Sequence, residues 1–146
     1  MDTSNTTLTA SQKKRQNFSK KRQAILETIR NTTTHPTAEW VYQTLKPEYP
    51  DLSLGTVYRN IAAFKKEGLI CRAAIVNGQE RLDGNLSAHS HFICKECGAV
   101  LDLYEDVADP ARNQVIEQNY QVEVEYQKVV FYGKCSACKS GSAGLP

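Results

Sequence analysis

Long apolar runs are missing from this chain of 146 residues. No stretch approaches the roughly 18 consecutive apolar residues that a membrane-spanning helix needs. The residues up to Phe18 are polar and then basic, so they lack the apolar segment of a secretory signal. No internal repeat is visible, and no nucleophile or general-base motif is present. These absences argue against a membrane protein, a secreted protein and an enzyme, and we expect a cytoplasmic protein.

Net charge is also small, at +2, but it is unevenly distributed. Residues 1–82 hold 13 Lys and Arg against 7 Asp and Glu, whereas residues 83–146 hold 5 against 9. Seven of the basic residues lie between Lys13 and Arg30. A basic front half indicates a polyanionic partner such as nucleic acid. The alternative is a solvated basic arm without a partner.

Four of the five cysteines form two Cys-x-x-Cys pairs, Cys94 with Cys97 and Cys135 with Cys138. Each pair holds two sulfurs at the spacing that one tetrahedral zinc ion needs, and together they complete a four-thiolate site. Cytoplasmic thiols stay reduced, which favours zinc over a redox pair of disulfides. Four thiolates leave no open position, so the zinc is predicted to be structural. The fifth cysteine, Cys71, is expected to be a small buried residue.

The front half of the chain predicts three helices followed by a β-hairpin. The first helix is expected over about 19–30 after a disordered segment at 1–12, and His35-Pro36 is expected to open the second. Ser53 is a good N-cap for the third, which Gly68 ends. Strands are expected at 69–76 and 79–83 around an Asn77-Gly78 turn. This order is typical of a winged helix-turn-helix that reads a major groove, although an ordinary three-helix domain with a hairpin is the alternative.

The back half predicts a smaller domain after a linker at 84–88. Short strands are expected at 91–94 and 99–103, and Asp109-Pro110 is expected to start a helix that runs to about 119. Alternating apolar and polar residues from Val122 predict a half-exposed strand that continues to Tyr132. The fold class is therefore α+β, with a winged helix-turn-helix at 1–83 and a small α/β metal-binding domain at 89–146.

The only three histidines lie at places where carboxylates can join them. His89 and His91 are two residues apart, so on a strand both rings point to one face. Asp83 ends the hairpin, Asp102 lies on the next strand, and His35 lies at the entrance of the second helix. Imidazole and carboxylate ligands suit iron, manganese or zinc. The alternatives are a capping or surface His35 with a solvated Asp102, a hydrolase or oxygenase metal centre, or a zinc-stabilised interaction module without regulation.

Several motifs resemble, in order and spacing, those of the ferric uptake regulator (Fur) family. The likeness runs from about Phe18 to Lys139. It implies a homodimeric, metal-dependent transcriptional repressor whose winged helix reads an inverted-repeat DNA operator and whose C-terminal α/β domain dimerises. The motifs are His35-Pro36-Thr37-Ala38, Ser53-Leu54-Gly55-Thr56-Val57-Tyr58-Arg59-Asn60, Arg81-Leu82-Asp83, the stretch from His89-Ser90-His91 to Cys94-Lys95-Glu96-Cys97-Gly98, and Tyr132-Gly133-Lys134-Cys135-Ser136-Ala137-Cys138.

The resemblance also implies a regulatory metal site and a branch of the family. The regulatory ligands fall on His35, Asp83, His89, His91 and Asp102. Iron-sensing members commonly carry glutamates at the two aspartate positions, whereas the peroxide-sensing branch (PerR) carries aspartates. Many iron sensors have a further site with additional histidines, where this chain has Ala88 and a histidine-free run at 123–128. The likeness is therefore closest to peroxide sensors, and an iron- or zinc-responsive repressor of the same family is the alternative.

For the mechanism, the resemblance implies that regulatory Fe²⁺ lets peroxide oxidise His35 or His89 and so release DNA, whereas Mn²⁺ in the same site represses but resists peroxide. Arg59 is expected to pair with a guanine edge and Tyr58 to meet a thymine methyl group. Phosphate contacts would make the affinity salt-dependent. The full set of predicted DNA-binding residues is Lys14, Arg15, Lys20, Lys21, Arg22, Ser53, Thr56, Tyr58 and Arg59.

Overall fold

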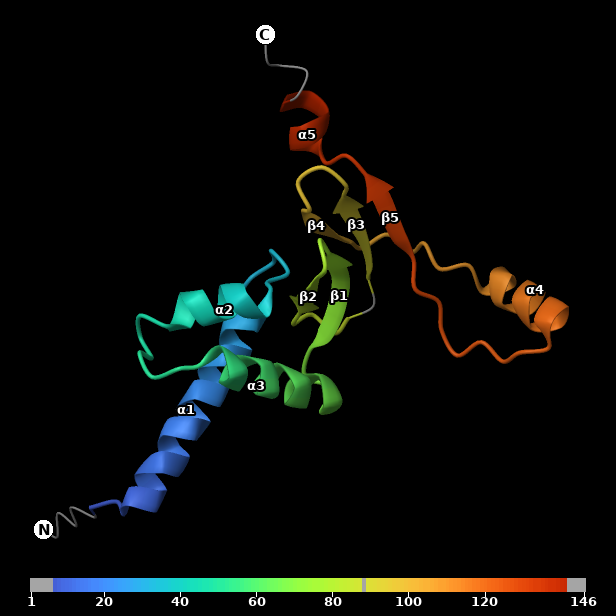
Figure 1. The fold of residues 1–146 in the computed structure, drawn as a ribbon. Coiled ribbons are helices and arrows are strands. Elements are labelled where there is room, and N and C mark those ends of the chain that lie inside the picture. Colours follow the sequence, from blue (N-terminus) through green and yellow to red (C-terminus); the bar gives the residue numbers. More distant parts are fainter. Residues whose placement is uncertain (1–6, 88, 142–146) are drawn as a thin grey trace, which may run out of the picture. The chain divides into compact units, whose positions relative to one another are not determined.

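The computed structural model of the chain describes residues 7–87 and 89–141. The chain divides into two compact units, of which the first holds Met1–Ile75 with Gln79–Leu86 and the second holds Val76–Gly78 with Ser87–Pro146. Helices dominate the first unit and a three-stranded sheet the second, so the predicted α+β class is confirmed (Figure 1). In the part of the chain that is described, no helix combines the length and apolarity needed to cross a membrane.

Helix α1 spans Ala10–Arg30 and so begins nine residues before the expected start at 19. The cause is a capping box at Thr9. The Thr9 hydroxyl accepts from the Gln12 amide at 3.2 Å, and the Gln12 side chain accepts from the Thr9 amide at 2.8 Å. The expectation of disorder over 1–12 is therefore wrong from Ala10 onward, and residues 1–6 lie outside the described part.

Only the C-terminal half of α1 is buried, and Figure 1 shows its N-terminal half extending beyond α2 and α3. Helix α2 spans Ala38–Leu45 and is capped by Thr37, whose hydroxyl accepts from the Trp40 amide at 3.1 Å. The expectation that His35-Pro36 opens this helix is wrong. His35 has a left-handed backbone (φ 56°), so the helical conformation starts only after Thr37.

Helix α3 spans Leu54–Lys66 and begins after the predicted N-cap, Ser53. Strands β1 (Cys71–Val76) and β2 (Gln79–Asp83) form the predicted hairpin, and both turn residues, Asn77 and Gly78, have positive φ. The winged-helix order is thus confirmed, although Cys71 is exposed and not buried as expected. The core of this unit is Ile25, Leu26, Ile29, Ala38, Val41, Leu45, Leu52, Val57, Ile61, Phe64, Ile70 and Leu82.

The second unit is built on a sheet with the strand order β4-β3-β5. Strand β3 (Ser90–Cys94) pairs antiparallel with β4 (Val100–Leu103) and parallel with β5 (Val130–Gly133). This register places His91 opposite Asp102, and Cys94 opposite Gly133. The sheet therefore places one member of each predicted group of metal ligands, His91 and Cys94, on its central strand.

Helix α4 (Pro110–Tyr120) starts at the predicted N-cap Asp109, and none of its residues is buried. A short helix α5 (Ser136–Gly141), which was not predicted, begins directly after Cys135. The strand expected from Val122 is wrong before Val130. Because β3 offers a ladder partner only opposite 130–133, the preceding residues have no neighbouring strand in this chain over the part described.

Candidate functional site

The four predicted zinc ligands come together in the second unit. Cys94 ends β3, Cys97 follows in a turn that Gly98 completes with φ 76°, Cys135 directly precedes α5, and Cys138 lies in its first turn. The Sγ atoms of Cys97 and Cys135 are 3.7 Å apart. Four sulfurs bound tetrahedrally at about 2.3 Å from zinc lie about 3.8 Å apart, so the spacing fits a zinc ion. The four-cysteine site therefore suits a structural zinc.

Backbone N–H groups stabilise the thiolate form of Cys94 in this cluster. Its Sγ accepts from the backbone amides of Cys97 at 3.5 Å and Cys135 at 3.4 Å. These N–H groups lower the pKa of the Cys94 thiol to about 6. The neighbouring sulfurs of Cys135 and Cys94 raise the pKa of Cys138. Cys94 is thus the first thiolate available at neutral pH, and zinc binding must release a proton from Cys138.

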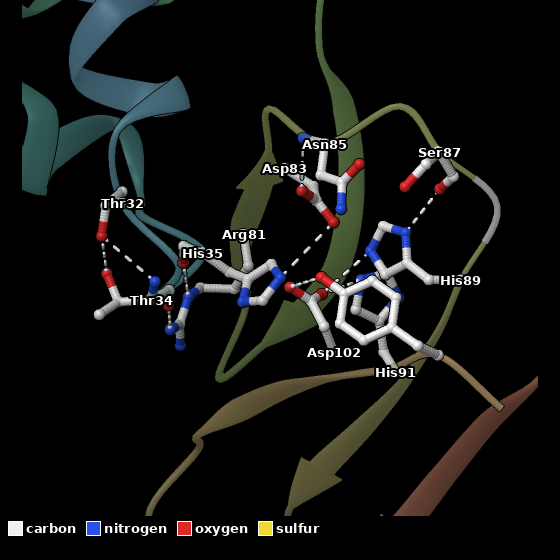
Figure 2. A network of polar contacts seen from close by, with 11 residues as sticks. Thr32, Thr34, His35, Arg81, Asp83, Asn85, Ser87, His89, His91 and Asp102 are labelled. Atoms are coloured by element: carbon white, nitrogen blue, oxygen red, sulfur yellow. Dashed lines mark hydrogen bonds and ion pairs between the residues drawn. The ribbon is translucent and has the colours of Figure 1, made fainter.

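In the first unit, His35 and Asp83 form a buried pair. His35 Nε2 lies 3.5 Å from Asp83 Oδ2, and the side chains are only 2% and 5% exposed (Figure 2). The Asn85 amide donates to Asp83 Oδ1 at 2.8 Å, which leaves Oδ2 directed at the imidazole. A buried carboxylate beside an imidazole is a common part of a metal site.

The loop that carries His35 is held by its neighbours on β2. Arg81 Nε donates to the His35 carbonyl, and Arg81 Nη2 donates to the Thr34 carbonyl at 2.6 Å. The Leu82 amide donates to the Pro36 carbonyl at 2.9 Å. Burial lowers the pKa of the Arg81 guanidinium. These contacts fix the left-handed conformation of His35 and place its ring beside the end of β2.

In the second unit, two histidines converge on one carboxylate. Asp102 Oδ1 lies 3.0 Å from His89 Nε2 and 3.2 Å from His91 Nε2 (Figure 2). The His89 Nδ1–H donates to the Ser87 carbonyl at 2.6 Å, which leaves Nε2 directed at Asp102. Two imidazole nitrogens and a carboxylate oxygen within 4.8 Å of one another suit iron or manganese.

The predicted DNA-binding residues all lie in the first unit, but not in equivalent surroundings. Lys21 pairs with Asp51 at 2.7 Å, and Arg22 pairs with Glu67 at 2.6 Å while its guanidinium lies over the Phe64 ring. These two cations therefore brace α1 against the rest of the unit. Lys14, Arg15 and Lys20 are exposed on the same helix.

Helix α3 presents its predicted contacts at its N-terminal half. Ser53 and Thr56 hydroxyls lie 2.8 Å apart, and Arg59 Nη2 donates to Thr56 Oγ1 at 3.1 Å. The Tyr58 hydroxyl donates to Glu39 at 2.5 Å, and this bond raises the pKa of Tyr58. A cleft of about 790 Å³ between α1 and α3 is lined by basic residues such as Lys13, Lys14 and Arg59 together with apolar ones such as Phe18.

Three features of the metal clusters were not predicted. Arg81 belongs to a recognised motif, but nothing in the sequence says that its side chain holds the loop at His35. No sequence pattern predicts that the Ser87 carbonyl accepts a hydrogen bond from His89. Tyr104 follows Asp102 by two residues, and this spacing on a strand is the one available indication that both lie on the same side.

Known proteins are similar to this chain over most of its length. The sequence model of the Ferric uptake regulator family matches residues 13–132. The peroxide-responsive repressor PerR of Staphylococcus aureus (strain USA300) is 33% identical over 119 residues, which cover 81% of this chain and 79% of that protein.

Solved structures give the same fold. The Campylobacter jejuni peroxide stress regulator is 26% identical with a TM-score of 0.68, over 90% of this chain and 100% of that chain. The Vibrio cholerae ferric uptake regulator, whose structure shows rearrangement of its DNA-binding domains, is 29% identical with a TM-score of 0.60, over 78% and 88%. The chain thus has similarity along most of its length to metal- and peroxide-linked regulators.

Proposed function

The chain belongs to the ferric uptake regulator family, and we propose that it is a metal-dependent, DNA-binding transcriptional repressor that senses peroxide. The observation that carries this function is the convergence of His89 and His91 on Asp102, which offers nitrogen and oxygen ligands and no sulfur. Such a set holds iron or manganese while the four cysteines take zinc. The similarity to peroxide-responsive repressors favours peroxide over iron or zinc as the signal.

In this proposal the regulatory ion takes ligands from both units: His35 and Asp83 from the first, and His89, His91 and Asp102 from the second. Two observations support it. Each group is already oriented by its own unit, and the buried Asp83 carboxylate lies 3.5 Å from the His35 imidazole. An ion bound to both groups would restrict the motion between the units, and its effect on DNA affinity is limited by its preference for that arrangement.

Residues 1–83 are proposed to bind the operator and residues 89–146 to form a homodimer, with 84–88 as the linker; Ala88 lies outside the described residues. The second unit exposes many large apolar side chains that a partner copy would cover, namely Leu101, Val115, Ile116, Tyr120, Val122 and Phe131. Two copies would present two α3 helices to successive major grooves of an inverted repeat. Reduced thiols at the zinc site fit a cytoplasmic protein.

Iron-loaded protein exposed to hydrogen peroxide is expected to gain oxygen at His35 or His89. His35 and His89 would hold a ferrous ion that can supply an electron to peroxide, so their imidazoles would lie within reach of the oxidant. Mass spectrometry of proteolytic peptides measures the gain, with manganese-loaded protein as the control. If peroxide destroyed repression while His35 and His89 stayed unmodified, this mechanism would be wrong.

Replacing Arg59 by alanine is expected to cost about 1–3 kcal/mol of operator affinity and to relax specificity at one base pair. The reason is that Arg59 lies exposed on α3, where a bidentate contact with a guanine edge is possible. Binding to an operator set with single base changes measures both effects. Lys20→Ala is the control, because loss of a phosphate contact weakens all sequences equally. An equal loss on every operator for Arg59→Ala would reduce its role to phosphate binding.

A further inference from the structure

A tyrosine lies against two of the second unit's proposed metal ligands. Tyr104 follows the end of β4, and its ring stacks on the His89 imidazole with centroids 5.6 Å apart and an angle of 29° between the planes. Its hydroxyl donates to Asp102 Oδ2 at 3.4 Å. The phenol is therefore close to both ligands although it supplies no ligand atom in the proposed site.

Tyr104 also differs from these ligands in its exposure. The His89 and Asp102 side chains are 3% and 14% exposed, whereas Tyr104 is 66% exposed. His89 and Tyr104 line a cleft of about 470 Å³ together with residues that include Asp106 and Lys128. A small oxidant that enters this cleft meets the Tyr104 ring beside a nearly buried imidazole.

We propose that Tyr104 is a second site of oxidation by peroxide, at which its ring is hydroxylated to a catechol. This inference rests on the proposed function, because it needs ferrous iron at the regulatory site. Electron-rich phenol rings react very rapidly with hydroxyl radicals, and such radicals react close to where they form. The stacking on His89 and the contact with Asp102 place the Tyr104 ring in that range.

The reaction balances without a further reagent. Hydrogen peroxide takes one electron from ferrous iron and divides into hydroxide and a hydroxyl radical. The radical forms a carbon–oxygen bond at the ring carbon beside the phenol hydroxyl. The ring radical returns one electron to ferric iron and gives the displaced proton to hydroxide. The sum is one tyrosine and one peroxide to one catechol and one water.

Hydroxylation of Tyr104 uses an oxidising equivalent without removing a ligand nitrogen. Tyr104 therefore competes with His89 for the same oxidant, and the partition between them sets how much peroxide is needed to destroy the site. A chain without an aromatic ring at 104 is expected to lose repression at a lower dose of peroxide.

The test uses the full-length protein loaded with zinc and Fe²⁺ and a limiting dose of hydrogen peroxide. Trypsin separates the two targets, because His89 and His91 fall in the peptide 82–95 and Tyr104 falls in 96–112. The only methionine, Met1, lies in neither peptide. After cysteine alkylation, tandem mass spectrometry is expected to assign one added oxygen to Tyr104 and one to His89 in separate fractions of the sample.

Two controls identify oxidation that is local to the site. Tyr120 is 69% exposed, which matches Tyr104, and lies at the end of α4 in the peptide 113–128. It is expected to stay unmodified, as is Tyr104 in manganese-loaded protein. Equal oxygen gain at Tyr104 and Tyr120, or gain with manganese, would mean diffuse radical damage and overturn the inference.

The variant Tyr104→Leu removes the ring that takes up oxygen. It is expected to lose the added oxygen on 96–112 and to increase the oxidised fraction of 82–95 at the same dose, when both proteins are saturated with Fe²⁺ before peroxide. Oxygen at His35 or His89 but none at Tyr104 in the unsubstituted protein overturns the role of Tyr104 and leaves peroxide sensing intact. No oxygen on any of these residues overturns both.

Discussion

Replacing Asp102 by alanine is expected to abolish metal-dependent operator binding. Both His89 and His91 approach the Asp102 carboxylate, at 3.0 and 3.2 Å. Loss of an outer partner of a ligand typically weakens metal affinity about 10- to 100-fold, so loss of a ligand itself is expected to reach at least the upper end of that range. Metal titration followed by operator binding measures both steps.

Glu105→Ala is the matched control for this substitution. Glu105 is an exposed carboxylate three residues along the chain, so its loss changes the net charge by the same amount without touching the histidines. Its metal affinity and operator binding are expected to stay close to those of the unsubstituted protein. If Asp102→Ala retained repression and its response to metal ions, the proposed regulatory site would be wrong.

Replacing Cys94 by serine is expected to unfold the second unit. Among the residues that the structure describes, the buried apolar side chains of this unit are only Ile93, Cys94 and Val100, whereas the first unit has a core of twelve. A structural zinc contributes about 10–16 kcal/mol in small zinc-binding domains. That exceeds or equals the net stability of a typical domain, about 5–15 kcal/mol. The zinc therefore replaces much of the missing core.

The measurements are zinc content, oligomeric state and thermal unfolding of the full chain. Cys94→Ser is expected to lose zinc and dimerisation, while the helical signal of the first unit remains because its core does not include the cysteines. Cys71→Ser is the control, since this exposed cysteine lies on β1 outside the cluster. A zinc-free Cys94→Ser protein with a folded, dimeric second unit would contradict the structural role of the metal.

Local signals in the sequence predicted most of the fold. Ser53 and Asp109 cap the helices expected after them, and Asn77-Gly78 forms the expected hairpin turn because both residues tolerate positive φ. Thr9 and Gln12 form a capping-box pattern, but the polar composition of the segment suggested disorder, so the start of α1 was not predicted. The strand expected from Val122 failed for a non-local reason, because alternation does not supply a neighbouring strand.

The ligands of the two metal sites could also be predicted from the sequence. Cysteine spacing alone indicated the four-thiolate cluster, and the pairing of β3 with β5 explains why the two pairs meet. The spacing of His89 and His91 predicted a shared face, and the register of β3 with β4 puts Asp102 opposite His91. The contacts of Arg81 and Tyr104 depend on side-chain directions that no sequence pattern encodes. The sequence therefore indicated the ligands but not the residues that orient or cover them.

Operator affinity of iron-loaded and manganese-loaded protein, each measured before and after one dose of hydrogen peroxide, separates peroxide sensing from metal sensing. We predict that both forms bind before treatment and that peroxide releases only the iron-loaded protein from DNA. Fresh iron should not restore binding, because the loss comes from an oxidised ligand. Equal affinity of both forms after peroxide, or full recovery on adding iron, would contradict a repressor that is inactivated by oxidation of its own histidines.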